Sequence, residues 1–196
     1  MKNFALAIFI GLDYPILREV KMRKADELEN GAVMTLARLM AAAARTAPKT
    51  RGIDNIEVIA IDDKATKKRV IAKMFRIAKR DRLPTLERDA NSIKNSPIIL
   101  LIGARSNPAG LNCGFCGYET CEVLAKTKGA CVYNSIDLGI ACASAISIAS
   151  QFHIDNRVMY SIAKACLELG LLDKKVKLAL GIPLSVSGKN PFFDRE

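Results

Sequence analysis

The sequence contains a single histidine, His153, and no serine or cysteine that its pattern pairs with that side chain. A general base needs a reacting partner within hydrogen-bond reach. His153 follows an apolar segment, so we expect it at the surface or at the edge of the core. The sequence therefore shows no ordinary hydrolytic site.

Long hydrophobic runs are also lacking. The longest uninterrupted apolar stretch is Phe4 to Ile10, whereas a spanning helix needs about 20 apolar residues. No small-residue cleavage signal follows this stretch convincingly. These absences predict a cytoplasmic protein without a membrane span.

The first residues differ in character from the rest of the chain. Residues 1–14 are apolar and carry only Lys2 and Asp13 as charges, and ordinary helical sequence begins near Met22. We expect residues 1–24 to be an N-terminal extension or an arm that packs on the core or on a partner subunit. Residues 25–196 have a length suited to one core, so they are predicted to form a single domain.

Acidic residues are scarce in one part of the chain. Between Lys64 and Lys94 there are eleven basic residues and three acidic ones. Apolar residues recur here at helical spacing, which predicts a basic amphipathic helix. Such a helix suits nucleic acid, an acidic membrane or an acidic electron carrier, although a solvated face explains it equally. Phe75 is the only aromatic residue in the segment, which leaves little for base stacking, so nucleic acid is not the expected partner.

The remaining pattern alternates strands and helices. Helical periodicity covers 27–45, before Pro48, and two apolar helices are expected over 137–152 and 156–169. Strands are expected over 56–61, 97–103 and 176–184, the second being buried on both faces. These elements predict an α+β fold in which helices cover a central mixed β-sheet.

Six cysteines in a chain without an export signal argue against disulfides and favour metal or redox chemistry. Cys113, Cys116, Cys121 and Cys131 have the spacing C-x2-C-x4-C-x9-C. Three thiols within nine residues suit a cubane iron–sulfur cluster, which needs four converging thiolates. The site is expected in an inserted loop over 111–131.

Neighbouring residues fit the same interpretation. Gly114 and Gly117 allow the backbone to curl and bring amide groups near an anionic cluster. Cys121 begins a helical stretch whose positive end favours negative charge, and Thr120 is expected to cap it.

Alternatives remain open at this site. Structural zinc also uses four cysteines, although usually as two C-x2-C pairs, and a C-x2-C pair can act as a redox dithiol. Cys142 is the next thiol along the chain and competes with Cys131 as the fourth ligand. Cys142 and Cys166 lie on apolar helices, where an inert buried thiol is the common case.

The string from Cys113 to Cys121 resembles the CGxCGxxxC loop of corrinoid iron–sulfur proteins and ferredoxin-like electron-transport subunits, which bind a [4Fe-4S] cluster. From about residue 25 onward the chain resembles DUF2148, an uncharacterised family of ferredoxin-domain proteins. Residues 41–48, 137–141 and 181–183 resemble segments of the flavin-binding nitroreductases, in the same order. The resemblance implies a nitroreductase-like fold.

The nitroreductase resemblance also implies FMN, flavin-dependent oxidoreductase activity and a homodimer with flavin at its interface. The family's basic R-x-S-x-R segment is not present, because residues 23–29 lack the serine and turn acidic. The residues proposed to contact the flavin instead are Lys49, Arg51, Asn55, Lys189 and Arg195.

The predicted function is therefore that of an iron–sulfur redox protein, in electron transfer or flavin-linked oxidoreduction. Its partner would be an electron donor or acceptor, either a protein or a small molecule. One alternative is a non-catalytic cluster protein, with a structural or redox-sensing role, that docks a partner through the basic helix. Another is a zinc-stabilised binding module.

Overall fold

The computed structural model describes residues 22–193 of the chain, so the predicted N-terminal extension or arm lies almost wholly outside the described residues. Its centre is a four-stranded sheet in the order β1-β2-β4-β3. The strands are β1 (Ile56–Ile61), β2 (Ile98–Arg105), β3 (Asp155–Asn156) and β4 (Val176–Ser185).

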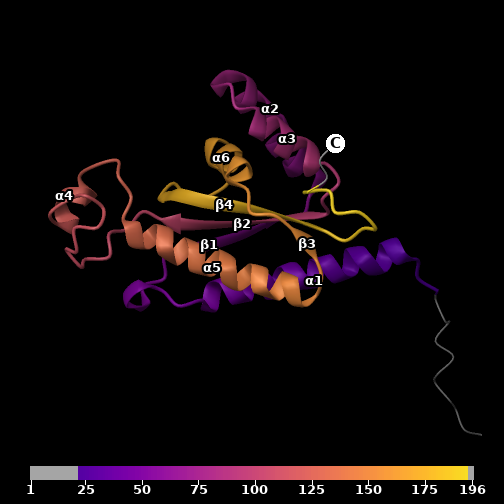
Figure 1. The fold of residues 1–196 in the computed structure, drawn as a ribbon, viewed down its shortest axis with the longest axis horizontal. Coiled ribbons are helices and arrows are strands. Elements are labelled where there is room, and N and C mark those ends of the chain that lie inside the picture. The colour runs from indigo at the N-terminus through magenta and orange to yellow at the C-terminus, as the bar shows by residue number, and fades with distance from the viewer. Residues whose placement is uncertain (1–21, 194–196) are drawn as a thin grey trace, which may run out of the picture.

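Helices cover both faces of this sheet (Figure 1). One layer contains α1 (Ala25–Thr46) and α5 (Val132–Gln151). The other contains α2 (Lys64–Asp81), α3 (Pro84–Ser92) and α6 (Tyr160–Glu168). A short helix, α4 (Cys121–Ala125), lies beyond one end of the sheet, and a 3-10 turn, Thr50–Gly52, follows α1.

Strand β2 shows why a continuous apolar run becomes a central strand. Successive side chains of a strand point to opposite faces. Leu100 and Ile102 belong to the core beneath α1 and α5, whereas Ile99 and Leu101 belong to the core beneath α2, α3 and α6. Both faces of β2 are therefore buried, as its sequence predicted.

All three strand pairings among the described residues are antiparallel, which corrects the predicted mixed sheet. The connection between β1 and β2 explains the difference. It contains two helices, α2 and α3, and the second brings the chain back to the edge of the sheet where β1 ends. A single helix would have returned the chain to the end of the sheet where β1 begins, and β2 would then run parallel to β1.

The basic segment forms two helices rather than one. The predicted amphipathic helix is α2, which buries Val70, Met74 and Ile77. Arg82 then adopts a left-handed conformation, and Pro84 begins α3 at a position where its missing N–H is not needed. The charge of the segment is thus divided between two helices on one face of the sheet.

Helix α6 approaches β4 closely because Gly181 has no side chain. A Cβ atom at this position would lie 2.6 Å from Cβ of Ile162. Gly181 also pairs with Met159, which immediately precedes α6. The glycine thus fixes the distance between the helix and the sheet.

By length and composition alone, α5 is the one helix in residues 22–193 that is long and apolar enough to cross a membrane. In this fold it packs on α1 and on the sheet, and it buries Leu138, Ala141 and Ala145. Small residues along it allow this close packing, as for a core helix.

Candidate metal centre

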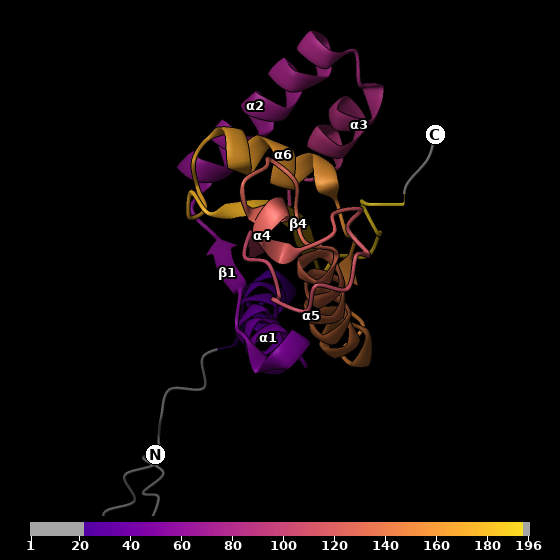
Figure 2. The same ribbon diagram turned by 90° about the vertical axis from the view of Figure 1, so that its left-hand side faces the viewer.

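The cysteine loop extends from the end of β2 and returns to the start of α5, beyond one end of the sheet (Figure 1), and it faces the viewer in Figure 2. Cys113, Cys116, Cys121 and Cys131 all line one hollow in this loop. All four are free thiols, and Cys131 is buried while the other three are partly exposed. The structure thus brings together the four cysteines that the sequence grouped.

The backbone of the loop curls around this hollow. Asn112, Gly114 and Gly117 have positive φ angles of 48°, 73° and 81°. Nothing lies within 4 Å of the Cβ position of either glycine, so these glycines serve backbone conformation rather than close packing.

Asn112 and Cys121 bind each other across the loop. The side-chain carbonyl of Asn112 accepts a hydrogen bond of 2.8 Å from the Cys121 amide, and the Asn112 amide lies 3.4 Å from the Cys121 Sγ as a donor. A backbone amide directed at sulfur stabilises negative charge there. The sequence analysis did not identify this role of Asn112.

Two helices begin at the hollow. Thr120 caps α4 by accepting a 3.3 Å hydrogen bond from the Val123 amide, as predicted. Cys131 is the N-cap residue of α5, a helix of 20 residues. The positive end of α5 therefore lies at Cys131, beside the hollow that the four thiols line.

A single metal ion and an iron–sulfur cluster require different arrangements of thiolates. Four thiolates around one zinc ion lie about 3.8 Å apart, given a Zn–S distance of about 2.3 Å. In residues 22–193, no three cysteine, histidine or acidic side chains are grouped as a single ion requires. The four thiols that line one hollow, with the Asn112 amide directed at Cys121 and the α5 N-terminus at Cys131, are the donor set that an iron–sulfur cluster uses.

The other two cysteines lie in the protein core. Cys142 is on α5 beneath the sheet, and Cys166 is on α6 against the opposite face. Burial raises the pKa of each thiol to about 12. Neither lines the hollow, so in this structure Cys131, rather than Cys142, completes the group of four.

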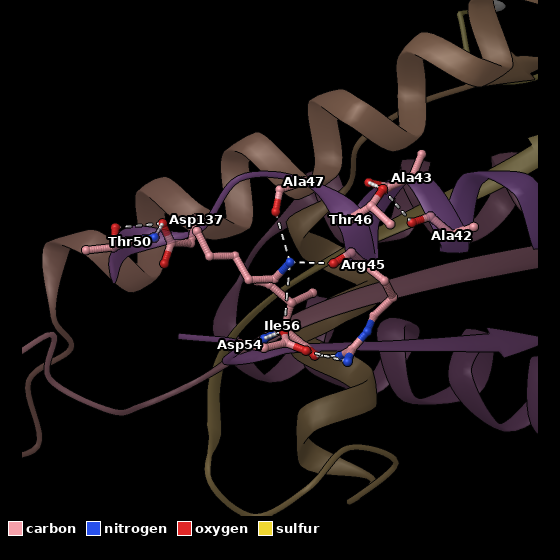
Figure 3. Close-up of polar contacts among 10 residues, drawn as sticks. Ala42, Ala43, Arg45, Thr46, Ala47, Thr50, Asp54, Ile56 and Asp137 are labelled. Atoms are coloured by element: carbon pink, nitrogen blue, oxygen red, sulfur yellow. Dashed lines mark hydrogen bonds and ion pairs between the residues drawn. The ribbon is translucent and has the colours of Figure 1, made fainter. Parts of the chain in front are cut away.

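The residues expected to contact a flavin begin at the end of α1 (Figure 3). Arg45 pairs with Asp54 and donates to the Ile56 carbonyl. The Lys49 ammonium donates to the carbonyls of Arg45 and Ala47, the latter at 2.9 Å. Lys49 therefore caps the C-terminal end of α1, and a phosphate contact would have to replace these bonds.

The 3-10 turn that follows α1 is tied to α5. Asp137 is buried, and its Oδ1 accepts hydrogen bonds from the Thr50 amide at 3.0 Å and from the Thr50 hydroxyl at 2.8 Å (Figure 3). The sequence does place a carboxylate within an apolar helix, which is a signal for such a contact, but the contact was not predicted.

The same turn contacts the cysteine loop. Arg51 has a positive φ of 55°, and its Nη1 donates a 2.9 Å hydrogen bond to the carbonyl of Ala109, a residue that lines the cysteine hollow. Asn55 accepts a 3.4 Å hydrogen bond from Asn107 at the base of the loop. Arg51 and Asn55 thus lie near the cysteine site.

Lys189 is not part of that group within one chain. It lines a hollow with Glu29, near the first residue of α1, whereas Lys49 follows its last residue. These two ends of α1 are about 33 Å apart, at 1.5 Å per residue over 22 residues. Arg195 lies outside the described residues.

The fold and the site define a class. The structure resembles the hypothetical oxidoreductase YcnD from Bacillus subtilis, with a TM-score of 0.55 and 18% identity over 80% of this chain. It also resembles a nitroreductase with bound FMN from Desulfitobacterium hafniense, with a TM-score of 0.52 and 13% identity over 86% of this chain and 81% of that one. The chain spans 58% of the YcnD chain. This is a nitroreductase-like α+β fold with a four-cysteine loop.

Sequence comparison identifies the family. Residues 127–195 match the model of uncharacterised proteins containing a ferredoxin domain, DUF2148. An uncharacterised protein of Archaeoglobus fulgidus is 40% identical over 178 residues, which cover 86% of this chain and 95% of the relative. The chain belongs to the DUF2148 family. The matched range contains Cys131 but begins after the other three cysteines of the hollow.

Proposed function

We propose that this protein is an iron–sulfur redox protein of the cytoplasm, in which Cys113, Cys116, Cys121 and Cys131 hold one [4Fe-4S] cluster. The observation that carries the proposal is that four free thiols, separated by up to 18 positions in sequence, line a single hollow. When bound, such a cluster supplies one-electron chemistry.

The chain's own residues support this role by position and charge. The Asn112 amide is directed at the Cys121 sulfur, and α5 begins at Cys131, so both place positive partial charge beside the sulfur atoms that would hold an anionic cluster. Asn112 also holds the amide of Cys121, which fixes the position of that thiol relative to the loop.

Metal analysis of protein purified without oxygen tests the proposal. We expect about four iron and four sulfide ions per chain, with a broad absorption band near ~400 nm. Zinc without iron would overturn the cluster and favour a structural zinc site. A protein with neither metal, even after anaerobic reconstitution with iron and sulfide, would leave the thiols without this role.

We propose FMN as the electron partner within the protein, because a flavin exchanges one or two electrons and a cluster exchanges one. The nitroreductase-like fold supports this, as do Arg51 and Asn55 near the cysteine hollow. A flavin spectrum that remains after removal of the cluster would favour flavin-linked oxidoreduction. Absence of bound flavin, and of flavin binding on addition of FMN, would favour a cluster that serves an external electron partner, or a structural or sensing role.

We also propose that two copies associate through the exposed face of α1 and α5. Leu39, Ile136 and Ile140 expose 48%, 44% and 37% of their surface there, which is high for large apolar side chains. Sedimentation of the wild type should give a dimer, and Ile140→Glu should give a monomer with an unchanged iron content. A monomeric wild type would contradict this part of the proposal.

A further inference from the structure

A second hollow, at the opposite end of the fold from the cysteines, has a different chemistry. It lies between the N-terminal end of α2 and the connection from α3 to β2, and its volume is about 700 Å³. Its charged lining residues are all basic: Lys64, Lys67, Lys68 and Lys94. Like charges placed together repel one another unless an anion lies between them.

The basic residues of α2 differ along its length in whether they are paired. Toward the C-terminal end, Lys73 and Arg80 form ion pairs with Glu168, at 2.8 and 2.7 Å. Lys64, Lys67 and Lys68 at its N-terminal end, and Lys94 after α3, form no ion pair within residues 22–193, and neither do Arg76 and Lys79 farther along α2. The four lysines of the hollow therefore have no ion-pair partner to balance their charge among the described residues.

Lys67 is held in the wall of this hollow. Its ammonium donates to the backbone carbonyls of Ser96 and Pro97, at 3.1 and 2.7 Å. Burial lowers the pKa of Lys67, although Asp62 and Asp63 oppose that shift. Lys67 thus builds the wall. The exposed side chains of Lys64 and Lys68 are available to a ligand, and the exposed ammonium of Lys94 lies 5.7 Å from the centroid of the Phe75 ring.

Ser96, in the same wall, provides an independent observation. The residue is 2% exposed, and its hydroxyl has no hydrogen-bond partner within the described part of the chain. Buried hydroxyls are nearly always bonded, so one without a partner at a hollow marks a position where bound groups complete the bonding. An anion's oxygen is the acceptor that this donor lacks.

An adjoining hollow of about 860 Å³ shares Asn30, Asn95 and Pro97 with the lysine hollow. Its lining includes Ser187 and the carboxylate of Glu29. Lys189 also lines it, so one acid and one base face each other there rather than basic residues alone, and the amides of Asn30 and Asn95 suit an uncharged polar group. The two hollows together therefore have a cationic part and a polar part.

We propose that the hollow lined by Lys64, Lys68, Lys94 and Ser96 binds the phosphate group of a phosphorylated small molecule, whose uncharged polar part extends past Asn30 and Asn95. The site is separate from the cysteine hollow, and it stands whether or not an iron–sulfur cluster is bound.

Calorimetric titration of the full-length protein with inorganic pyrophosphate tests the site, with sodium chloride present to keep the ionic strength constant. We expect saturable binding that weakens at least tenfold in the Lys64→Gln/Lys68→Gln variant. Both side chains are exposed and form no hydrogen bond or ion pair within residues 22–193, so the variant should fold. The matched control is Arg76→Gln/Lys79→Gln, which removes the same charge from exposed positions of α2 outside the hollow.

The results distinguish a specific binding site from nonspecific electrostatic attraction to a basic surface. Loss of pyrophosphate affinity in the first variant with less than a twofold change in the control supports the proposal. Equal weakening in both variants, or no saturable binding, overturns it. Salt-sensitive binding of duplex DNA without pyrophosphate binding would also overturn it, in favour of a nucleic-acid surface.

Discussion

The guanidinium of Arg51 lies 2.9 Å from the backbone carbonyl of Ala109 and donates a hydrogen bond to it, which joins the turn after α1 to the wall of the cysteine hollow. A Cβ atom at Gly110 would lie 2.9 Å from the same guanidinium nitrogen. The arginine therefore lies directly over the backbone of the loop.

Arg51→Ala removes this contact, and we expect the free energy of unfolding to fall by about 1 kcal/mol, the net value of one such hydrogen bond. Urea unfolding of the metal-free protein measures it. Arg38→Ala serves as the control, because Arg38 is exposed on α1 and lies away from the loop. Equal losses in both variants would show that the contact contributes nothing.

Cys131 and Cys142 lie in different surroundings, so substituting each one should show which of them is the fourth ligand. Cys131→Ala should abolish or sharply reduce iron retention in protein purified without oxygen, because Cys131 lines the hollow. Cys142→Ala should retain the wild-type iron content, since its thiol is buried beneath the sheet with a pKa raised to about 12. The reverse result would move the fourth ligand to Cys142.

Asp137 stabilises the turn after α1 through two hydrogen bonds to Thr50. Asp137→Ala leaves the amide and hydroxyl of Thr50 without their acceptor, and hydrogen bonds to charged groups are each worth about 1.5 to 3 kcal/mol. We expect a loss of about 2 kcal/mol in denaturant unfolding. Asp137→Asn keeps an acceptor oxygen, so its loss should be smaller.

Glu168 connects α6 to α2 and should make stability depend on pH. Hydrogen bonds from Arg80 and Lys73 lower the pKa of its carboxyl to about 2 from an ordinary 4.5. A carboxyl with a lowered folded-state pKa contributes stability above its unfolded pKa and loses it as pH falls through the folded value. The free energy of unfolding should therefore decrease from about pH 5 to pH 2.

Glu168→Gln provides the test of this assignment, because glutamine does not titrate. Thermal unfolding followed from pH 7 to pH 2 should show a shallower decline for the variant than for the wild type. Parallel curves for the two proteins would assign the acid sensitivity to other carboxyls.

Two buried serines should respond to alanine substitution in opposite directions. The hydroxyl of Ser96 has no partner in the described structure, whereas that of Ser161 donates to Asp89 at 2.6 Å. Without ligand, Ser96→Ala should raise the free energy of unfolding by about 1 kcal/mol, because it removes an unsatisfied buried donor. Ser161→Ala should lower it by about 2 kcal/mol. A loss in both variants would show that Ser96 is bonded in solution.

The sequence predicted the regular elements well where periodicity was strong. The expected helix over 27–45 corresponds to α1, and the expected strand over 56–61 is β1 without a shift. The prediction of 156–169 as one helix began too early, because Asp155 and Asn156 pair with β4 before α6 begins at Tyr160. Two-residue strands carry no periodic signal.

The sequence patterns predicted neither the direction of the strands nor helix α3. The direction depends on the path between strands, which local periodicity does not contain. Helix α3 did have a signal, because Pro84 at a helix start is common, but its nine residues were read as part of one basic segment.

The cysteine group was predictable because its spacing is local, whereas the lysine hollow was not. Lys64 and Lys94 are 30 positions apart, and they meet only because α2 and α3 pack as a hairpin against the sheet. Local motifs are visible in sequence, and sites assembled by packing are not.

The cysteine loop has a small core of its own, formed by Ala109, Leu124 and Cys131, while the two large cores lie on the two faces of the sheet. The sheet and its helical layers can therefore close before any metal arrives. Binding of the proposed cluster would then take place on a folded scaffold, with the four thiols held at one end of the sheet. Oxidative damage to the centre would then require repair of the loop alone, and not refolding of the chain.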